Sequence, residues 1–125
     1  MPNIFQHGIN LLRHSLRDVG VSVKRSPKWE KLEREFKEAH PTCAACGSSN
    51  RLNVHHIEPF HIKPELELDP NNLITLCMDK NECHLQLGHL GNFKLYNLQI
   101  KEDAAKALKY PGALEKIIKI AKTRK

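Results

Sequence analysis

The sequence has no long apolar run and nothing that resembles a secretory leader. Its first ten residues lack a basic start followed by an apolar stretch, and no segment approaches the roughly 20 apolar residues that cross a bilayer. We therefore expect no membrane contact and a cytoplasmic location. Aromatic residues are also scarce, at 6% of the 125 residues. A single small domain with so few large side chains buries only a modest core, so a bound metal ion would help to hold its fold.

Positive charge, in contrast, is in excess. The formal net charge is +6, which favours an anionic partner, with nucleic acid first among the candidates. The charge is uneven: residues 1–42 carry 8 basic and 5 acidic side chains, residues 43–100 carry 4 and 6, and residues 101–125 carry 8 and 3. The basic regions therefore flank the middle of the chain, where all four cysteines and five of the eight histidines lie.

Helical apolar spacing dominates the N-terminal region. Residues 4–19 have this spacing, and a second helix is predicted to start at Ser26, a suitable N-cap, and Pro27, a suitable first helical residue. Pro41 ends this second helix. One of its faces is expected to pack on the core through Trp29, Leu32, Phe36 and Ala39.

Two more helical segments are predicted at the C-terminus, over residues 102–109 and 111–125, with Pro111 starting the second. An apolar strip on the last helix should pack on the core through Leu114, Ile117, Ile118 and Ala121. The opposite side, expected to face solvent or DNA phosphate, carries Lys116, Lys119, Lys122 and Arg124. Two interpretations of that basic side stay open: an ordinary solvated surface, or an arm on the DNA backbone.

The middle of the chain changes from helical to strand-like patterns. One strand is predicted through Val54 and Ile57, stopped by Pro59, and a second over residues 72–77. A loop rich in turn signals separates them, and a helix is expected to begin near Cys83. We therefore predict an α+β domain, in which a β-hairpin and a helix are wrapped by N-terminal and C-terminal helices.

The four cysteines have the spacing of a metal site. Cys43 and Cys46 form a Cys-x2-Cys turn, and Cys77 and Cys83 follow at the end of the second strand. Such a turn directs two thiolates at one tetrahedral cation, at about 2.3 Å from each sulfur. The second pair, with five residues between its members, is looser than usual. We predict a structural Zn²⁺ site, because four thiolates leave no open position for catalysis. The alternatives are a disulfide, which the expected compartment disfavours, and two unrelated buried thiols.

Histidines and one asparagine form the second candidate site: His55, His56, Asn72, His84 and His89. In a hairpin followed by a helix, the strand with His55 and His56 neighbours the helix start at His84, and zinc at Cys83 would fix that start. Neutral imidazole binds divalent cations and accepts a proton from water. Adjacent strand residues face opposite ways, so His55 and His56 would share one phosphate only with a local twist or bulge.

Four stretches in this order and spacing, CAAC, LNVHHIEPF, NNLITLC and ECHLQLGH, resemble the HNH endonuclease family, in particular its small zinc-containing phage and bacterial members. The resemblance covers about residues 43–97. It implies a ββα-metal (His-Me finger) core and hydrolysis of DNA phosphodiester bonds with a divalent cation such as Mg²⁺, Mn²⁺ or Ni²⁺.

The resemblance also implies roles for single residues. His55 resembles the first ligand of the catalytic cation, His56 the general base, and His84 the last ligand of the cation. Asn72 matches an asparagine that ties the hairpin loop and helps to orient the base. His89 resembles an additional ligand, although many relatives space the two helix histidines four residues apart and this chain spaces them five apart.

Three regions follow from these assignments: an N-terminal helical extension (1–42), a nuclease core with its zinc site (43–97) and a basic helical segment (98–125). The expected partner is DNA, with a phage packaging protein or another DNA-processing protein as a possible second partner. Two other functions stay open. One is a non-catalytic zinc-containing module that binds nucleic acid, and the other is a protein-interaction adaptor built around a zinc knuckle.

Overall fold

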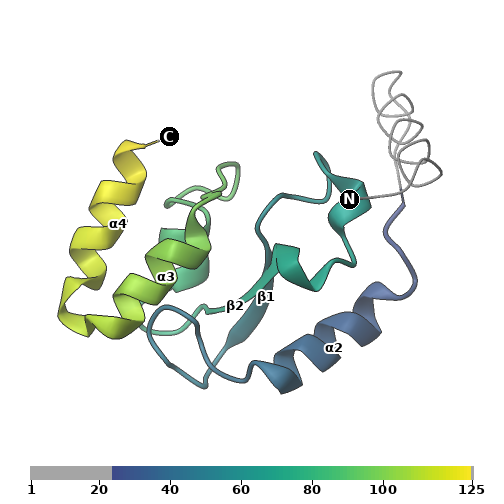
Figure 1. Ribbon diagram of the computed structural model, residues 1–125, viewed down its shortest axis with the longest axis horizontal. Coiled ribbons are helices and arrows are strands. Elements are labelled where there is room, and N and C mark those ends of the chain that lie inside the picture. The colour runs from purple at the N-terminus through teal and green to yellow at the C-terminus, as the bar shows by residue number, and fades with distance from the viewer. Residues whose placement is uncertain (1–23, 125) are drawn as a thin grey trace.

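The computed structural model describes residues 24–124, which form a small α+β structure (Figure 1). Its helices are α2 (Trp29–Ala39), α3 (Ile100–Lys109) and α4 (Leu114–Thr123), and its strands are β1 (Leu52–His56) and β2 (Leu73–Cys77). The predicted fold class is therefore confirmed at this level. The helix predicted over residues 4–19 lies outside the described residues. None of the described helices is long and apolar enough to cross a membrane.

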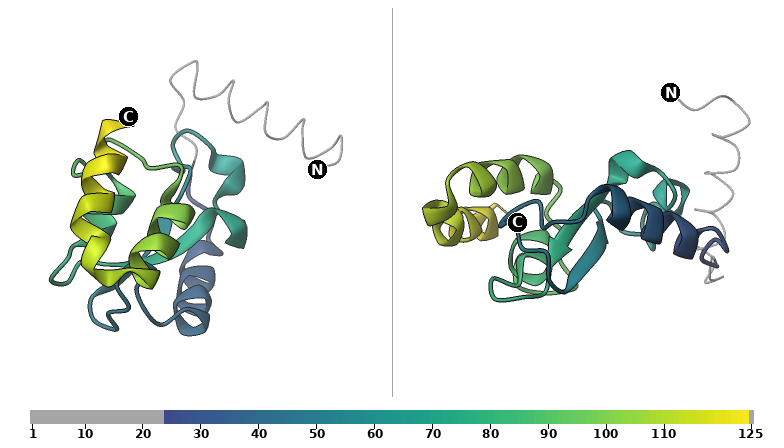
Figure 2. Two further views of the ribbon diagram at one scale, coloured as in Figure 1. Left: turned by 60° about the vertical axis from the view of Figure 1, so that its left-hand side comes forward. Right: turned by 90° about the horizontal axis from the view of Figure 1, so that it is seen from below.

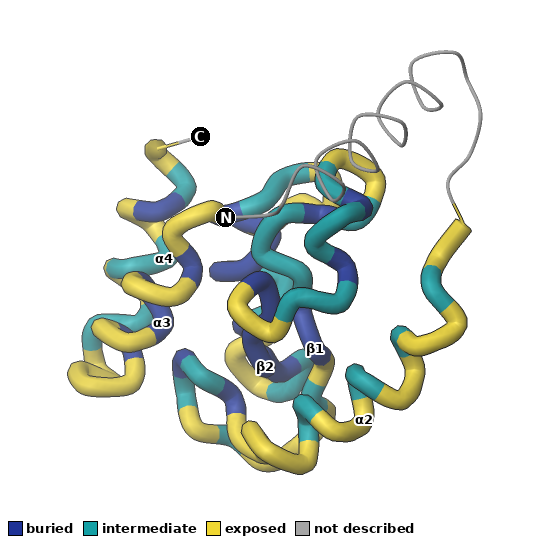
Figure 3. The backbone as a smooth tube through the Cα atoms, turned by 45° about the vertical axis from the view of Figure 1, so that its right-hand side comes forward, coloured by how far each residue is buried: buried dark blue, intermediate teal, exposed yellow. Residues whose placement is uncertain are grey.

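The two strands form an antiparallel hairpin at the centre of the structure. Pairing runs without interruption from Leu52 opposite Cys77 to His56 opposite Leu73, so β1 contains no bulge. α2 packs against β1, and α3 and α4 lie on the other side of the hairpin (Figure 2). Every residue of β2 is buried as a result, as the dark blue tube in Figure 3 shows.

The hydrophobic core lies between β2, the short helix that follows Cys83, and the two C-terminal helices. Its largest fully buried apolar side chains are Leu76, Leu87 and Ile100. Small residues on α3 and α4 let the helices approach closely, because Ala104, Ala107 and Ala121 are each only 1% exposed. The candidate metal ligands of the middle region therefore lie beside a continuous, well-packed hydrophobic core.

α2 starts two residues later than Pro27, although Ser26 still contributes to its start. The Ser26 hydroxyl accepts a hydrogen bond from the Lys28 N–H at 3.1 Å. The apolar face of α2 is only half-buried, and Ala39 is exposed. Trp29 lies on His56, with the ring centroids 4.4 Å apart. The predicted stripe therefore covers the outside of β1 and contributes no fully buried residue.

The C-terminal segment folds as two helices, joined by a turn that begins at Pro111, as predicted. The apolar strip of α4 does pack on the core: Ala121 is buried, and Leu114, Ile117 and Ile118 contact the core while partly buried. Lys122 donates a hydrogen bond to the Gln86 side chain at 2.9 Å.

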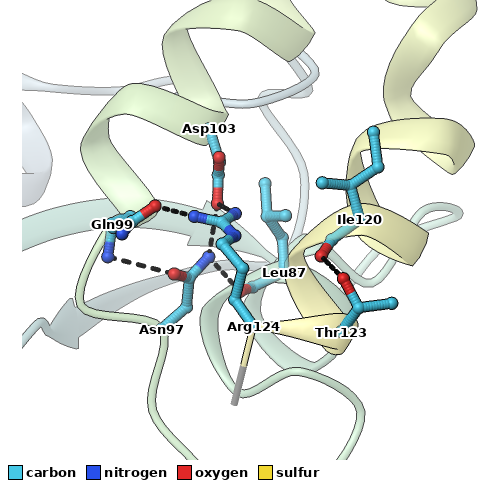
Figure 4. A network of polar contacts seen from close by, with 7 residues as sticks. All are labelled: Leu87, Asn97, Gln99, Asp103, Ile120, Thr123 and Arg124. Atoms are coloured by element: carbon cyan, nitrogen blue, oxygen red, sulfur yellow. Dashed lines mark hydrogen bonds and ion pairs between the residues drawn. The ribbon is translucent and has the colours of Figure 1, made fainter.

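Arg124 is exposed, as expected, but its guanidinium is also bound within the protein. Its Nη2 lies 2.5 Å from Oδ2 of Asp103 on α3, and it also donates to the Gln99 side chain (Figure 4). Asp103 is buried and accepts a second hydrogen bond from Asn97 at 2.8 Å. Asn97 in turn donates to the carbonyl of Leu87 at 3.1 Å. Arg124 therefore fastens the end of α4 to α3 and to the short helix.

Candidate functional site

The four cysteines come together as predicted. Cys43 and Cys46 stand on the turn before β1, Cys77 ends β2, and Cys83 precedes the short helix; their sulfur atoms all lie within 4.8 Å of one another. All four are free, and the sulfurs of Cys46 and Cys77 are 3.6 Å apart, much longer than a disulfide bond. Sulfurs that share one tetrahedral Zn²⁺ lie about 3.8 Å apart. The cluster thus suggests zinc and contradicts the disulfide alternative.

The environment favours the thiolate form of Cys43. Contact with Cys83 is the largest cause that lowers the pKa of Cys43, and the same contact raises the pKa of Cys83. Backbone N–H groups of Ala45 and Cys46 also lower the pKa of Cys43. Donors aimed at a sulfur stabilise the thiolate, which is the form that binds metal.

Three histidines form a second cluster about the short helix His84–Gly88. His55 comes from β1, and His84 and His89 stand at the two ends of this helix; one ring nitrogen from each lies within 4.8 Å of the others. Nε2 of His84 and Nε2 of His89 lie 3.2 Å apart. The structure therefore brings together the three residues predicted to bind a catalytic cation.

A π-helix explains how two histidines five residues apart meet. The N–H of His89 donates to the carbonyl of His84 at 3.0 Å, which is the i→i+5 hydrogen bond of a π-helix. In an α-helix, residues five apart would project about 140° away from each other. The wider turn returns His89 to the side of His84, so the unusual spacing does not remove it from the cluster.

Backbone and side-chain carbonyls orient two of these rings. Nδ1 of His84 lies 3.0 Å from Oδ1 of Asn53, and Nδ1 of His89 lies 2.9 Å from the carbonyl oxygen of Leu95. Each carbonyl accepts an N–H, so each ring carries its proton on Nδ1 and has a lone pair on Nε2. Nε2 of His55 is buried and has no hydrogen-bond partner among the described residues. Two lone pairs that face each other, next to a buried imidazole with an unpartnered nitrogen, fit a bound cation.

Burial keeps these imidazoles neutral. It lowers the pKa of His55 to about 2, with smaller contributions from His84 and His89, and it lowers the pKa of His84 to about 4. Burial also lowers the pKa of His89. Neutral rings at pH 7 are the form that binds metal. Three nitrogen ligands leave further coordination positions open, as catalytic sites require.

His56 lies outside this cluster but lines the same cavity. Its Nε2 is 3.0 Å from the carbonyl oxygen of Glu67, so Nε2 donates and the lone pair is on Nδ1. Burial is the main cause that lowers the pKa of His56, and the charge of Arg25 adds to it. The cavity has a volume of about 310 Å³ and is lined by His55, His56, His84 and His89, together with Arg25, Val54, Pro59, Phe60, His61 and Tyr96.

No bulge is needed to bring His55 and His56 to one cavity. β1 is regular up to His56, and the chain then folds so that Pro59, Phe60 and His61 close the cavity beyond the strand end. His61, on the loop after β1, is exposed and lines this cavity as well.

Asn72 is buried and holds the loop between the strands. Its Oδ1 accepts the N–H of Glu58 at 2.8 Å, and its Nδ2 donates to the carbonyls of Glu58 at 3.0 Å and Leu66 at 3.3 Å. Leu66 immediately precedes Glu67, whose carbonyl accepts from His56. Asn72 does not line the histidine cavity. This placement agrees with the expectation that it ties the loop.

Several residues that line or orient the site belong to no sequence motif that would have identified them. Asn53 was within reach of sequence reasoning, because it precedes His55 by two positions and therefore shares its strand face. Arg25 and the carbonyl of Leu95 reach the site through tertiary contacts, so no local pattern marks them. Gly88 permits the close packing: a Cβ there would lie 3.0 Å from Leu76 and 3.4 Å from the His55 ring.

Comparison with known proteins gives one finding. Residues 43–90 match the family model for HNH endonuclease. Neither the curated proteins nor the solved structures contain a match to the chain. The matched residues include the whole hairpin, all four cysteines and the three histidines of the cluster. This match supports the assignment of residues 43–90 to the HNH endonuclease family.

Proposed function

We propose that this protein is an endonuclease that hydrolyses DNA phosphodiester bonds with a divalent cation and with His56 as general base. One observation carries the proposal: three imidazoles direct ring nitrogens at one point, and His56 lines the same cavity. A non-catalytic module that only binds nucleic acid would have no use for a buried, unpartnered Nε2 on His55.

His55, His84 and His89 would hold the catalytic cation. Their nitrogen ligands suit Mn²⁺, Ni²⁺, Co²⁺ or Zn²⁺ as well as Mg²⁺. When bound, the cation would polarise a phosphoryl oxygen and stabilise the charge on the departing 3′-oxygen. The outer carbonyls of Asn53 and Leu95 keep two of the rings turned toward that position.

His56 would take the proton from the attacking water. Its Nε2–H stays on the carbonyl of Glu67, so Nδ1 is the nitrogen that accepts the proton. The same carbonyl stabilises the imidazolium that forms, and Trp29 limits movement of the ring. Asn72 would act indirectly, because its side chain holds the loop that carries Glu67.

A structural Zn²⁺ on the four cysteines would support this arrangement. Cys83 directly precedes His84, so a metal on Cys83 fixes the start of the helix that carries two cation ligands. We propose that the hairpin and this helix are a ββα-metal core in which the third element is a single π-helical turn. We also propose the division into an extension (1–42), a nuclease core (43–97) and a basic segment (98–125).

The biological setting follows from the family resemblance alone. It predicts a protein of phage or bacterial origin that acts on DNA in the cytoplasm, with a packaging or other DNA-processing protein as a possible partner.

The deciding experiment is incubation of the purified protein with supercoiled plasmid in Mg²⁺, Mn²⁺, Ni²⁺ or Zn²⁺. Wild-type protein should nick or linearise the plasmid with at least one cation. His56→Ala should lower the rate by about 10²- to 10⁴-fold and keep the zinc content and the melting temperature. His40→Ala is the matched control, because His40 is exposed and does not line the cavity. Full activity in the His56 variant would refute the assigned base.

A further inference from the structure

We infer that Arg25, fixed by Glu67, forms a binding subsite for a DNA backbone phosphate next to the bond that is cleaved. The inference rests on the proposed nuclease function and names a substrate contact outside the residues 43–90 that match the family. It also gives the segment before α2 a role at the site.

Arg25 is held in place on three sides. Its Nε lies 2.5 Å from Oε2 of Glu67, and its guanidinium carbon lies 4.7 Å from the ring centroid of Phe60 and 5.2 Å from that of Trp29. Stacking on aromatic faces and an ion pair at Nε together restrict the rotation of a long side chain. The guanidinium is therefore preorganised, so little conformational entropy is lost when it binds a ligand.

Glu67 uses only part of the donor capacity of Arg25. Its side chain is 4% exposed, and its second carboxylate oxygen accepts the N–H of Ser26 at 2.9 Å. Arg25 is 46% exposed, and its Nη1 and Nη2 groups have no partner among the described residues. Four N–H donors thus stay available on a side chain that lines the histidine cavity.

The charge of the cavity selects an anion. Among the described residues that line it, Arg25 is the one permanently charged side chain, and none carries a carboxylate. A planar fork of N–H donors matches two oxygens of a phosphate group. Since the three clustered histidines would direct their cation at the cleaved phosphodiester, Arg25 is left to bind a neighbouring phosphate of the same strand.

Glu67 links this subsite to the general base. Its carboxylate holds Arg25, and its backbone carbonyl accepts the Nε2–H of His56 at 3.0 Å. One buried residue thus sets the position of the phosphate-binding group and the direction of the base. Glu67 is accordingly a positioning residue, and its side chain and its backbone make separable contributions.

The first test measures binding without cleavage. Full-length zinc-loaded protein with the His56→Ala substitution is titrated onto a fluorescent DNA duplex in Mn²⁺, with anisotropy as the readout and salt as a variable. Adding Arg25→Ala should weaken binding about tenfold and reduce the slope of log affinity against log salt by about one. Arg34→Ala removes the same charge from an exposed position on α2 that does not line the cavity, and should change neither quantity by as much. Equal effects of the two substitutions would overturn the inference.

The second test uses steady-state cleavage in the wild-type background. Arg25→Ala and Glu67→Gln should raise KM about tenfold and leave kcat nearly unchanged, because a flanking phosphate is bound equally in the ground and transition states. Arg25→Lys should recover part of the affinity. A fall in kcat with unchanged KM for Arg25→Ala would contradict the subsite. If the wild-type protein cleaves nothing, the proposed function fails, while the anisotropy comparison still decides the phosphate subsite.

Discussion

Nε2 of His84 and Nε2 of His89 lie 3.2 Å apart, although five residues separate the two positions in the chain. The i→i+5 hydrogen bond between their backbones produces this approach. The ring protons are turned away from each other, to Asn53 and to the carbonyl of Leu95, so two lone pairs meet. Like lone pairs at this distance repel unless a proton or a cation lies between them, and burial lowers the pKa of both rings.

We predict that His89→Ala weakens binding of Ni²⁺ or Mn²⁺ to the histidine cluster by more than about tenfold, because it removes one of three nitrogen ligands. Calorimetric titration of the zinc-loaded protein measures the affinity directly. His40→Ala, on an exposed histidine, should bind as the wild type does. Unchanged affinity in the His89 variant would show that the cluster does not bind the cation through this residue.

Asn53 should affect the cation affinity of the histidine cluster without binding the cation itself. Asn53→Ala removes the acceptor for Nδ1 of His84 and should reduce cation affinity by about 10- to 100-fold, since the ring loses its fixed orientation. Asn53→Asp keeps an acceptor, adds negative charge and should retain or increase the affinity. Because Asn53 is exposed, thermal stability should hardly change. Asn50→Ala is the control on a second exposed asparagine, and equal titration curves for the Asn50 and Asn53 alanine variants would contradict the prediction.

Gly88 offers a test of packing against the site. In Gly88→Ala the new Cβ would lie 3.0 Å from Leu76 Cδ1 and 3.4 Å from the His55 ring, so one or both must move. We expect a loss of about 1–3 kcal/mol of stability, the usual cost of overpacking, and a weaker cation site. Gly112→Ala is a matched control, since nothing lies within 4 Å of its Cβ position. Chemical denaturation of both variants, followed by Ni²⁺ titration, measures the two effects.

The cysteine cluster should contribute directly to folding. Cys46→Ala leaves three thiolates, and we expect loss of bound zinc and a fall in melting temperature of at least about 10 °C, which corresponds to more than about 2 kcal/mol in a domain of this size. Zinc content by mass spectrometry and thermal melting with and without a chelator check this. A variant that melts as the wild type does would show that the zinc is dispensable for the fold.

Sequence patterns predicted those parts of the structure that depend on neighbouring residues in the chain. Strand composition placed β1 and β2, and the Cys-x2-Cys turn pointed to the four-cysteine cluster. The π-helix at His84 could not be predicted, because it departs from regular α-helical hydrogen bonding and its packing against Leu76 and His55 is a tertiary contact. The role of Glu67 was also hidden, since a carbonyl is present at every position and only the fold decides which one faces His56.

The basic C-terminal helix requires a test that does not disturb the core. Removing the chain beyond Leu108 would expose the apolar residues that α4 covers, so lost DNA affinity could not be separated from lost structure. Single substitutions separate the two. Arg124→Ala leaves the buried Asp103 without its cation and should lower stability by about 2 kcal/mol, with DNA affinity nearly unchanged. Lys119→Ala removes an exposed charge and should leave stability unchanged.

The salt dependence of DNA binding then decides what the basic side does. If Lys119 contacts a phosphate, Lys119→Ala reduces the slope of log affinity against log salt by about one, and if it is only solvated the slope stays the same. Arg124→Ala should keep the wild-type slope in either case, because its guanidinium is already bound to Asp103. A reduced slope for Arg124→Ala at unchanged stability would mean that the ion pair opens when DNA binds.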